Sequence, residues 1–159
     1  MVIEKELKNL RRLTGASFLM SDFGAAAEAT IDYAGKAIVM AQWRSTAREL
    51  LDAVGWNDSK IVMRAFVGGA TLQISAPTDA LYAATELVKS SWTATTTKMA
   101  GVPFETDAIV RALREQIAEE LSPTEVALAQ SAREHGVTYL GHDDKISLGL
   151  GCGATVYDQ

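Results

Sequence analysis

Basic residues are the side chains of this chain whose types and spacing most favour ligand binding. Arg11 and Arg12 are adjacent, and Arg44 and Arg48 lie four residues apart in a segment with helical periodicity. Residues four apart on a helix share one face, and a guanidinium can donate two parallel hydrogen bonds to a carboxylate. The arginines therefore indicate a local basic face, while the simpler interpretation is a solvated charged surface without a ligand.

The Gly-rich segment 149–154, GLGCGA, contains the only cysteine, Cys152. A thiolate would be nucleophilic if a neighbouring base lowered its pKa, but nothing in the sequence places a base beside it. The glycine spacing is similar to that of a phosphate loop, yet the Lys-Ser/Thr pair and the following helix are missing. We interpret the segment as a tight turn with a packed thiol. One cysteine also excludes an internal disulfide and a cysteine-based metal site.

The two histidines, His135 and His142, have no partner at the i, i+4 spacing of a metal site. His135 is expected at the end of a helix, where an imidazole interacts favourably with the terminal carbonyl groups. Asp143 and Asp144 follow His142 and could hold Mg²⁺ or a basic group, but neighbouring residues in a strand point in opposite directions. We therefore favour a polar turn and predict no catalytic residue and no metal site. A small enzyme that uses Asp143, Asp144 or Cys152 is the alternative.

An α/β (α+β) fold must position these residues, with a small mixed or antiparallel sheet covered by three to four helices. Hydrophobic periodicity and turn residues define the elements. Residues 2–14 are ambiguous between helix and strand. The expected helices are 36–54, 77–100, 106–121 and one that starts at 123; the expected strands are 27–33, 60–67, 70–75, 137–140 and 146–148.

Three local signals refine these elements. Gly68-Gly69 predicts a hairpin turn, because such positions need a positive φ. Ser122, Pro123 and Glu125 predict a helix start in which serine is the cap and glutamate reaches back to it. The second helix is expected to fray in its polar run TATTTK. The tryptophans are expected to fill the core; they are Trp43, Trp56 and Trp92.

Length and charge exclude several classes of protein. The 159 residues fit a single domain, 1–159, with a core at 1–101 that contains the hairpin, and helices plus a strand unit at 104–159. The net charge is −5, and residues 104–159 contain four Lys/Arg against ten Asp/Glu. This balance argues against a general nucleic-acid binder. No run of about 18 apolar residues and no signal-like start are present, so we expect no membrane association and a cytoplasmic location.

Three segments together resemble a known family. They are LRRLTGASFL at 10–19, GGATLQISAPTDALYAATEL at 68–87 and SPTEVALAQSAREHGVTYLGHDDKISLGLG at 122–151. Their order is similar to the N-terminal region of cyanophycin synthetases and of related Mur-ligase-like, ATP-dependent peptide ligases. That region is an accessory domain which holds the growing acidic and basic peptide, whereas the ATP chemistry lies in later domains.

The resemblance implies a non-catalytic, substrate-holding domain of an amide ligase system. It implies a ligase catalytic subunit or domain as partner, and an acidic or Arg-bearing peptide as ligand. The residues expected to bind peptide carboxylates are Arg11, Arg12, Arg44 and Arg48. No cofactor is expected on this chain, since ATP and Mg²⁺ would act only through the partner or a missing domain. A homo-oligomeric structural protein, with residues 81–92 as its interface, is a further alternative.

Overall fold

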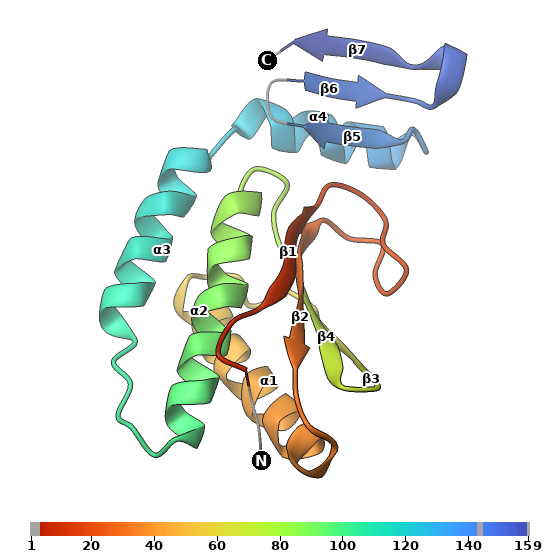
Figure 1. Ribbon diagram of the computed structural model, residues 1–159. Helices are drawn as coiled ribbons and strands as arrows, with labels where there is room; N and C mark the ends of the chain where they lie inside the picture. The colour runs from red at the N-terminus through yellow and green to blue at the C-terminus, as the bar shows by residue number, and fades with distance from the viewer. Residues whose placement is uncertain (1–3, 143–144, 159) are drawn as a thin grey trace.

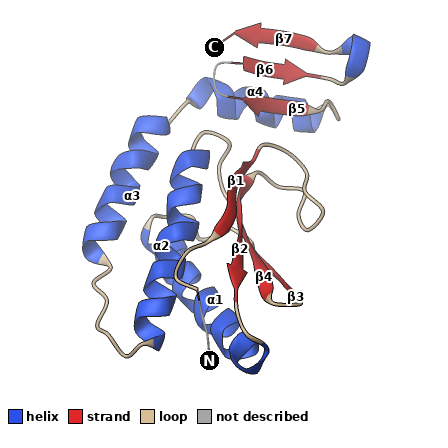
Figure 2. Ribbon diagram, in the orientation of Figure 1, coloured by secondary structure: helices blue, strands red, loops and turns tan. Residues whose placement is uncertain are grey.

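The computed structural model describes residues 4–142 and 145–158, which form a mixed α/β fold with two antiparallel sheets (Figure 1, Figure 2). The predicted fold class is confirmed. The helices are α1 (Lys36–Ala53), α2 (Leu81–Met99), α3 (Asp107–Glu120) and α4 (Pro123–Glu134). The strands are β1 (Lys8–Leu13), β2 (Gly24–Thr30), β3 (Ile61–Phe66), β4 (Gly69–Ser75), β5 (Tyr139–His142), β6 (Lys145–Leu148) and β7 (Thr155–Asp158).

The larger sheet has the strand order β1-β2-β4-β3, and the helices α1 and α2 cover one of its faces (Figure 1). Alternate residues of each strand point toward the helices, because the side-chain period of a strand is two. In β4 these are Ala70, Leu72 and Ile74, all fully buried. Trp43 of α1 and Trp92 of α2 fill the core, as predicted, and Trp56 packs against its margin.

The hairpin between β3 and β4 is confirmed, but its turn lies one residue earlier than predicted. Phe66 pairs with Gly69, so the turn is Val67-Gly68 and only Gly68 has a positive φ, 83°. Gly69 is already in the strand. An ideal Cβ there would lie 2.3 Å from the carbonyl oxygen of Ala29 on the neighbouring strand. The second glycine therefore allows a close approach between strands rather than a turn.

Helix α2 does not fray in the TATTTK run, contrary to the prediction. It continues to Met99, and Thr95 is fully buried. Threonine hydroxyl groups in this run donate to carbonyl oxygens one turn earlier, as Thr93 does to Lys89 at 3.0 Å and Thr95 to Ser91 at 2.7 Å. Because these hydroxyls bond within the helix and part of the run is buried, tertiary packing overrides the modest helix propensity of threonine.

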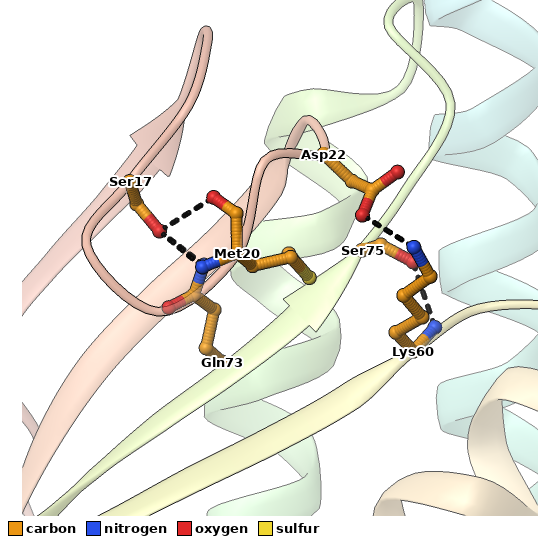
Figure 3. A network of polar contacts seen from close by, with 6 residues as sticks. All are labelled: Ser17, Met20, Asp22, Lys60, Gln73 and Ser75. Atoms are coloured by element: carbon orange, nitrogen blue, oxygen red, sulfur yellow. Dashed lines mark hydrogen bonds and ion pairs between the residues drawn. The ribbon is translucent and has the colours of Figure 1, made fainter.

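The loop between β1 and β2 folds over part of the other face of the larger sheet (Figure 3). Gln73 of β4, only 2% exposed, donates from Nε2 to the hydroxyl oxygen of Ser17 in this loop at 2.8 Å. The same hydroxyl accepts from the backbone N–H of Met20 at 3.1 Å. Lys60 forms an ion pair with Asp22 at 2.8 Å. These contacts fix the loop whose last residues lead into the cleft described below.

The C-terminal part has its own layer and its own core. α4 packs against the sheet β5-β6-β7, and their shared cluster contains Ala129, Ala132, Tyr139 and Ile146. The helix start at Pro123 is confirmed, but the predicted capping box is wrong. The Ser122 side chain makes no capping hydrogen bond. Its backbone N–H is bound by Asp79, and Glu125 instead accepts a hydrogen bond from Tyr139.

Candidate ligand-binding cleft

A cleft of about 240 Å³ lies where the larger sheet and its helix α2 meet the C-terminal part. Figure 1 shows α4 and the smaller sheet at one end of the larger sheet and α2. Strand β1, the start of α2, the α3–α4 junction and strand β5 each contribute to its walls. The chain brings these segments together although they are far apart in sequence. The polar residues and aromatic rings that line it include Arg12, Asp79, Tyr82, Glu120, Glu125 and Tyr139.

Arg12 supplies the positive charge of the cleft. Its position in β1 pairs with Ala25, whose side chain faces the helices, so Arg12 also projects to the helix-covered side. There its guanidinium lies over the ring of Tyr82, 4.1 Å from the ring centroid. A cation over an aromatic face is attracted to it and is held in a defined orientation.

Glu120, the last residue of α3, binds the N-terminus of α2. Its carboxylate accepts hydrogen bonds from the backbone N–H groups of Tyr82 at 2.9 Å and Ala83 at 2.7 Å. The residue at the N-cap position of α2 is Ala80, which has no side-chain acceptor. Glu120 therefore satisfies, from another helix, two N–H groups that a cap residue normally serves.

The pKa of Glu120 is raised above its usual value. Burial is the main cause, because it disfavours the charged carboxylate. The hydrogen bonds from Tyr82 and Ala83 and the charge of Arg12 act in the opposite direction and offset part of this effect.

Asp79, which lies before α2, binds the start of α4. It precedes α2, is 6% exposed, and its carboxylate accepts a hydrogen bond from the backbone N–H of Ser122 at 3.0 Å. Ser122 occupies the N-cap position of α4. The segment before α2 thus binds the start of α4, while the end of α3 binds the start of α2.

Tyr139 and Glu125 form the wall on the side of the smaller sheet. The Tyr139 hydroxyl donates to Glu125 Oε1 at 2.9 Å. Burial, together with this bond to an anionic acceptor, raises the pKa of Tyr139 well above its usual value. The ring of Tyr139 also packs edge-on against Phe23, with centroids 5.7 Å apart. The phenol is therefore a fixed donor to the carboxylate.

The chemistry of the cleft follows from these bonds. Its lining includes three carboxylates, those of Asp79, Glu120 and Glu125, and one guanidinium, and each carboxylate already accepts a hydrogen bond from a protein N–H or O–H group. A carboxylate can accept more hydrogen bonds than these, so acceptor capacity is left for a ligand. The volume suits one side-chain head group and is smaller than a typical cofactor pocket.

The four predicted arginines do not form one surface. Only Arg12 lies in the cleft; Arg11, its neighbour on β1, projects to the opposite face of the sheet and donates to the carbonyl oxygen of Asn9 at 2.9 Å. Arg44 and Arg48 are on α1, which packs toward β3 at the far edge of the sheet from β1. Arg48 donates to Asn57 O at 2.9 Å and stabilises the loop after α1.

The other predicted residues lie away from the cleft. His135 is at the end of α4, as expected, with its Nδ1 2.8 Å from the carbonyl oxygen of Ser131. Cys152 is exposed, in a short 3-10 turn between β6 and β7, rather than packed. Asp143 and Asp144 fall outside the described residues. Within the ranges 4–142 and 145–158, no group of histidine, cysteine and carboxylate residues is arranged to hold a metal ion.

Sequence reasoning missed Asp79, Glu120 and Tyr139 as members of one site. Glu120 lies 38 residues from Tyr82, and Asp79 lies 43 residues from Ser122. No motif spans such separations. The one local signal was Glu125, which the capping-box pattern singled out for a different bond.

A comparison with models of protein families finds no match, and a comparison with curated proteins finds none either. Among the residues that the structure describes, no helix combines the length and apolar character needed to cross a membrane.

Proposed function

We propose that this chain is a non-catalytic, substrate-holding domain of an ATP-dependent amide ligase system, and that it holds a peptide with basic side chains in the cleft. The observation that carries this proposal is the set of carboxylates from Asp79, Glu120 and Glu125 in a cleft of about 240 Å³. A guanidinium or ammonium group is small enough for this volume and complements its excess of negative charge.

Arg12 gives the cleft a group that can bind an acidic or carbonyl part of the peptide. Its guanidinium, oriented over Tyr82, can donate to a carboxylate or a carbonyl oxygen of the same peptide. A peptide that carries both charge types, as the resemblance to cyanophycin synthetases implies, would then place its basic group among the carboxylates and its acidic group on Arg12. The other three arginines contribute to this site less, because they lie on other faces.

The partner implied by this function is a ligase catalytic subunit or domain, which would supply the ATP and Mg²⁺ chemistry. We propose a cytoplasmic location for the chain together with this ligase partner. Holding the peptide near a separate catalytic centre raises its effective concentration there without any chemistry on this chain.

Calorimetric titration with short peptides of equal length tests the proposal. An arginine-containing peptide should bind, its citrulline analogue, which lacks the charge, should bind less, and added salt should weaken the binding. Glu125→Gln should reduce affinity by at most a few-fold, because one partly exposed charge contributes only about 0.2–1 kcal/mol. Glu119→Gln, a change of the same size on the exposed side of α3, is the control.

Two results would contradict the proposal. One is no binding of the arginine peptide at millimolar concentration. The other is equal affinity for the arginine and citrulline peptides. Comparison of Arg12→Ala with Arg44→Ala completes the test, since only the first change should weaken binding of a peptide that also carries a carboxylate.

A further inference from the structure

β1 and β3 are the two edge strands of the larger sheet (Figure 1), and they differ in how open they are to a further strand. β1 is irregular, because its register shifts between Lys8 and Arg11 and Asn9 has a positive φ of 51°. β3 pairs with β4 over its whole length in an unbroken register, and Arg64 is its only charged residue. Bulges and charges keep edge strands from pairing with other chains, so β1 is protected in this way and β3 is not.

Every second residue of β3 directs its backbone N–H and C=O groups away from β4. Just before the strand, the N–H of Ser75 donates to the carbonyl oxygen of Lys60 at 2.9 Å. Hydrogen-bonded pairs alternate along an antiparallel ladder, so Ile61, Met63 and Ala65 are the residues whose backbone groups point outward. Among the residues that the structure describes, no other strand, helix or side chain hydrogen-bonds to these outward groups.

A groove of about 480 Å³ lies between α1 and the start of β3. Its lining residues are Ala41, Arg44, Ser45, Arg48 and Ile61. Among these described residues there are two guanidinium groups and no carboxylate. Two contacts show that α1 follows β3 along its length. Lys36, at the start of α1, donates to the carbonyl oxygen of Phe66. Arg48, three turns later, donates to that of Ser59. The groove is therefore basic and follows the open edge.

The two arginines of the groove have capacity for further acceptors. Arg44 is exposed and forms no hydrogen bond or ion pair with any residue that the structure describes. Arg48 is held by the carbonyl oxygens of Asn57 and Ser59, and its contact with Asp52 is exposed and 3.4 Å long. Residues four apart on a helix are about 6 Å apart along its axis, and alternate residues of a strand are about 6.7 Å apart. Carboxylates at positions i and i+2 of an added strand therefore match this pair.

We propose that β3 and α1 form a docking surface for an extended, acidic segment of a partner protein. The segment adds to the larger sheet beside β3, so its backbone pairs with the outward groups of Ile61, Met63 and Ala65. Its carboxylates bind Arg44 and Arg48. The surface lies at the opposite edge of the sheet from β1 and the cleft, so it is independent of the proposed function.

Charge favours an acidic partner over a second copy of this chain. Two copies that paired through β3 would be related by a two-fold axis, which places the same residues on both sides of the interface. The arginines of the two α1 helices would then approach one another, and like charges across an interface are unfavourable. An acidic segment instead supplies the charge that the groove lacks.

Hydrogen exchange in the unmutated chain tests the docking surface directly. The probe is an eight-residue peptide in which glutamate and valine alternate. When this peptide is added, exchange of the outward amides of Ile61, Met63 and Ala65 should slow by about tenfold or more, because they gain acceptors. The amides of Val62 and Arg64, which already bond to β4, should not change. No slowing at millimolar peptide, or slowing confined to other parts of the chain, would overturn the proposal.

Two N-methylated forms of the peptide test the backbone pairing at constant charge. Alternate N–H groups of a strand lie on opposite edges, so methylation of the glutamate nitrogens blocks one edge and methylation of the valine nitrogens blocks the other. One form should bind about tenfold or more weakly than the parent peptide, because its ladder hydrogen bonds are lost, and the other should bind as the parent does. Equal affinities of the two forms would overturn strand addition.

Charge variants test the arginines. Arg44→Glu should weaken binding of the glutamate peptide by a few-fold or more, since it replaces an attraction by a repulsion. Arg111→Glu, the same change at an exposed position on α3, is the control and should have little effect. Equal losses in the two variants, or equal affinity for a peptide with glutamine in place of glutamate, would overturn the role of the basic groove.

Two further measurements separate the other occupants. Without peptide, slowing of the outward amides that increases with protein concentration would assign the edge to a second copy and overturn the proposal. The arginine peptide proposed for the cleft should neither slow these amides nor compete with the glutamate peptide. Failure of one proposal therefore leaves the other standing.

Discussion

Glu120 caps a helix to which it does not belong, since its carboxylate accepts a hydrogen bond from the backbone N–H of Tyr82 at 2.9 Å across 38 residues. A carboxylate at a helix N-terminus also interacts favourably with the helix dipole. Helix α2 therefore depends for its start on the end of α3. The four predictions that follow concern this contact, its ionisation and two contacts of the main core.

Replacement of Glu120 by alanine should lower the free energy of unfolding by about 0.5–2 kcal/mol, the usual cost of losing an N-cap acceptor. The N–H groups of Tyr82 and Ala83 would lose their partner. Urea unfolding followed by tryptophan fluorescence measures the loss. The neighbouring change Glu119→Ala should cost much less, and equal losses for the two variants would show that the cap does not stabilise the fold.

The raised pKa of Glu120 makes its contribution to stability depend on pH. Because the folded state favours the protonated carboxyl, this contribution is fully present below the usual pKa of a glutamate and is lost as pH rises through the raised pKa. Arg12, Asp79 and Glu125 are the other charged groups lining the cleft.

Comparison with Glu120→Gln isolates this effect, because glutamine keeps an acceptor oxygen and does not ionise. Unfolding free energies measured between about pH 4 and about pH 7 should show the unmutated chain losing stability relative to the variant as pH rises. A difference between the two proteins that is constant over this range would contradict the prediction.

Gly69→Ala should destabilise the larger sheet. The new Cβ would lie 2.3 Å from the Ala29 carbonyl oxygen, which is backbone and cannot move aside without shifting a strand. We expect a loss of about 1–3 kcal/mol, the range for overpacking. Gly153→Ala is the control, since a Cβ there meets nothing within 4 Å. Thermal unfolding of both variants measures the difference; equal midpoints would mean that the strands separate easily.

Ser91→Ala should leave a buried donor without a partner. The indole Nε1–H of Trp43 donates to the Ser91 hydroxyl at 2.9 Å inside the core between α1 and α2. A buried donor left unsatisfied costs about 1–3 kcal/mol. Denaturant unfolding should show this loss for Ser91→Ala and little change for Ser90→Ala on the same helix. A loss below the error of the measurement would indicate that water or a rearranged side chain replaces the hydroxyl.

Local sequence patterns determined most of the elements. Helical periodicity predicted α1 and α3 closely, and the paired glycines predicted the β3–β4 hairpin, because both signals act within a few residues along the chain. They placed the start of α2 at residue 77 instead of Leu81, and they predicted fraying of its threonine run, which burial keeps helical. They also missed β7, a four-residue strand that follows the Gly-rich turn.

The cleft was decided by tertiary structure. Arg11 and Arg12 look alike in the sequence, but alternation along β1 sends them to opposite faces of the sheet, and only the pairing with β2 shows which one meets α2. Ser122 and Glu125 read as a capping box, yet Asp79 and Tyr139 offer them other partners from distant segments. A short pattern describes the bonds that a residue can make with its neighbours in sequence, whereas the bonds it does make depend on which polar groups the folded chain brings within reach.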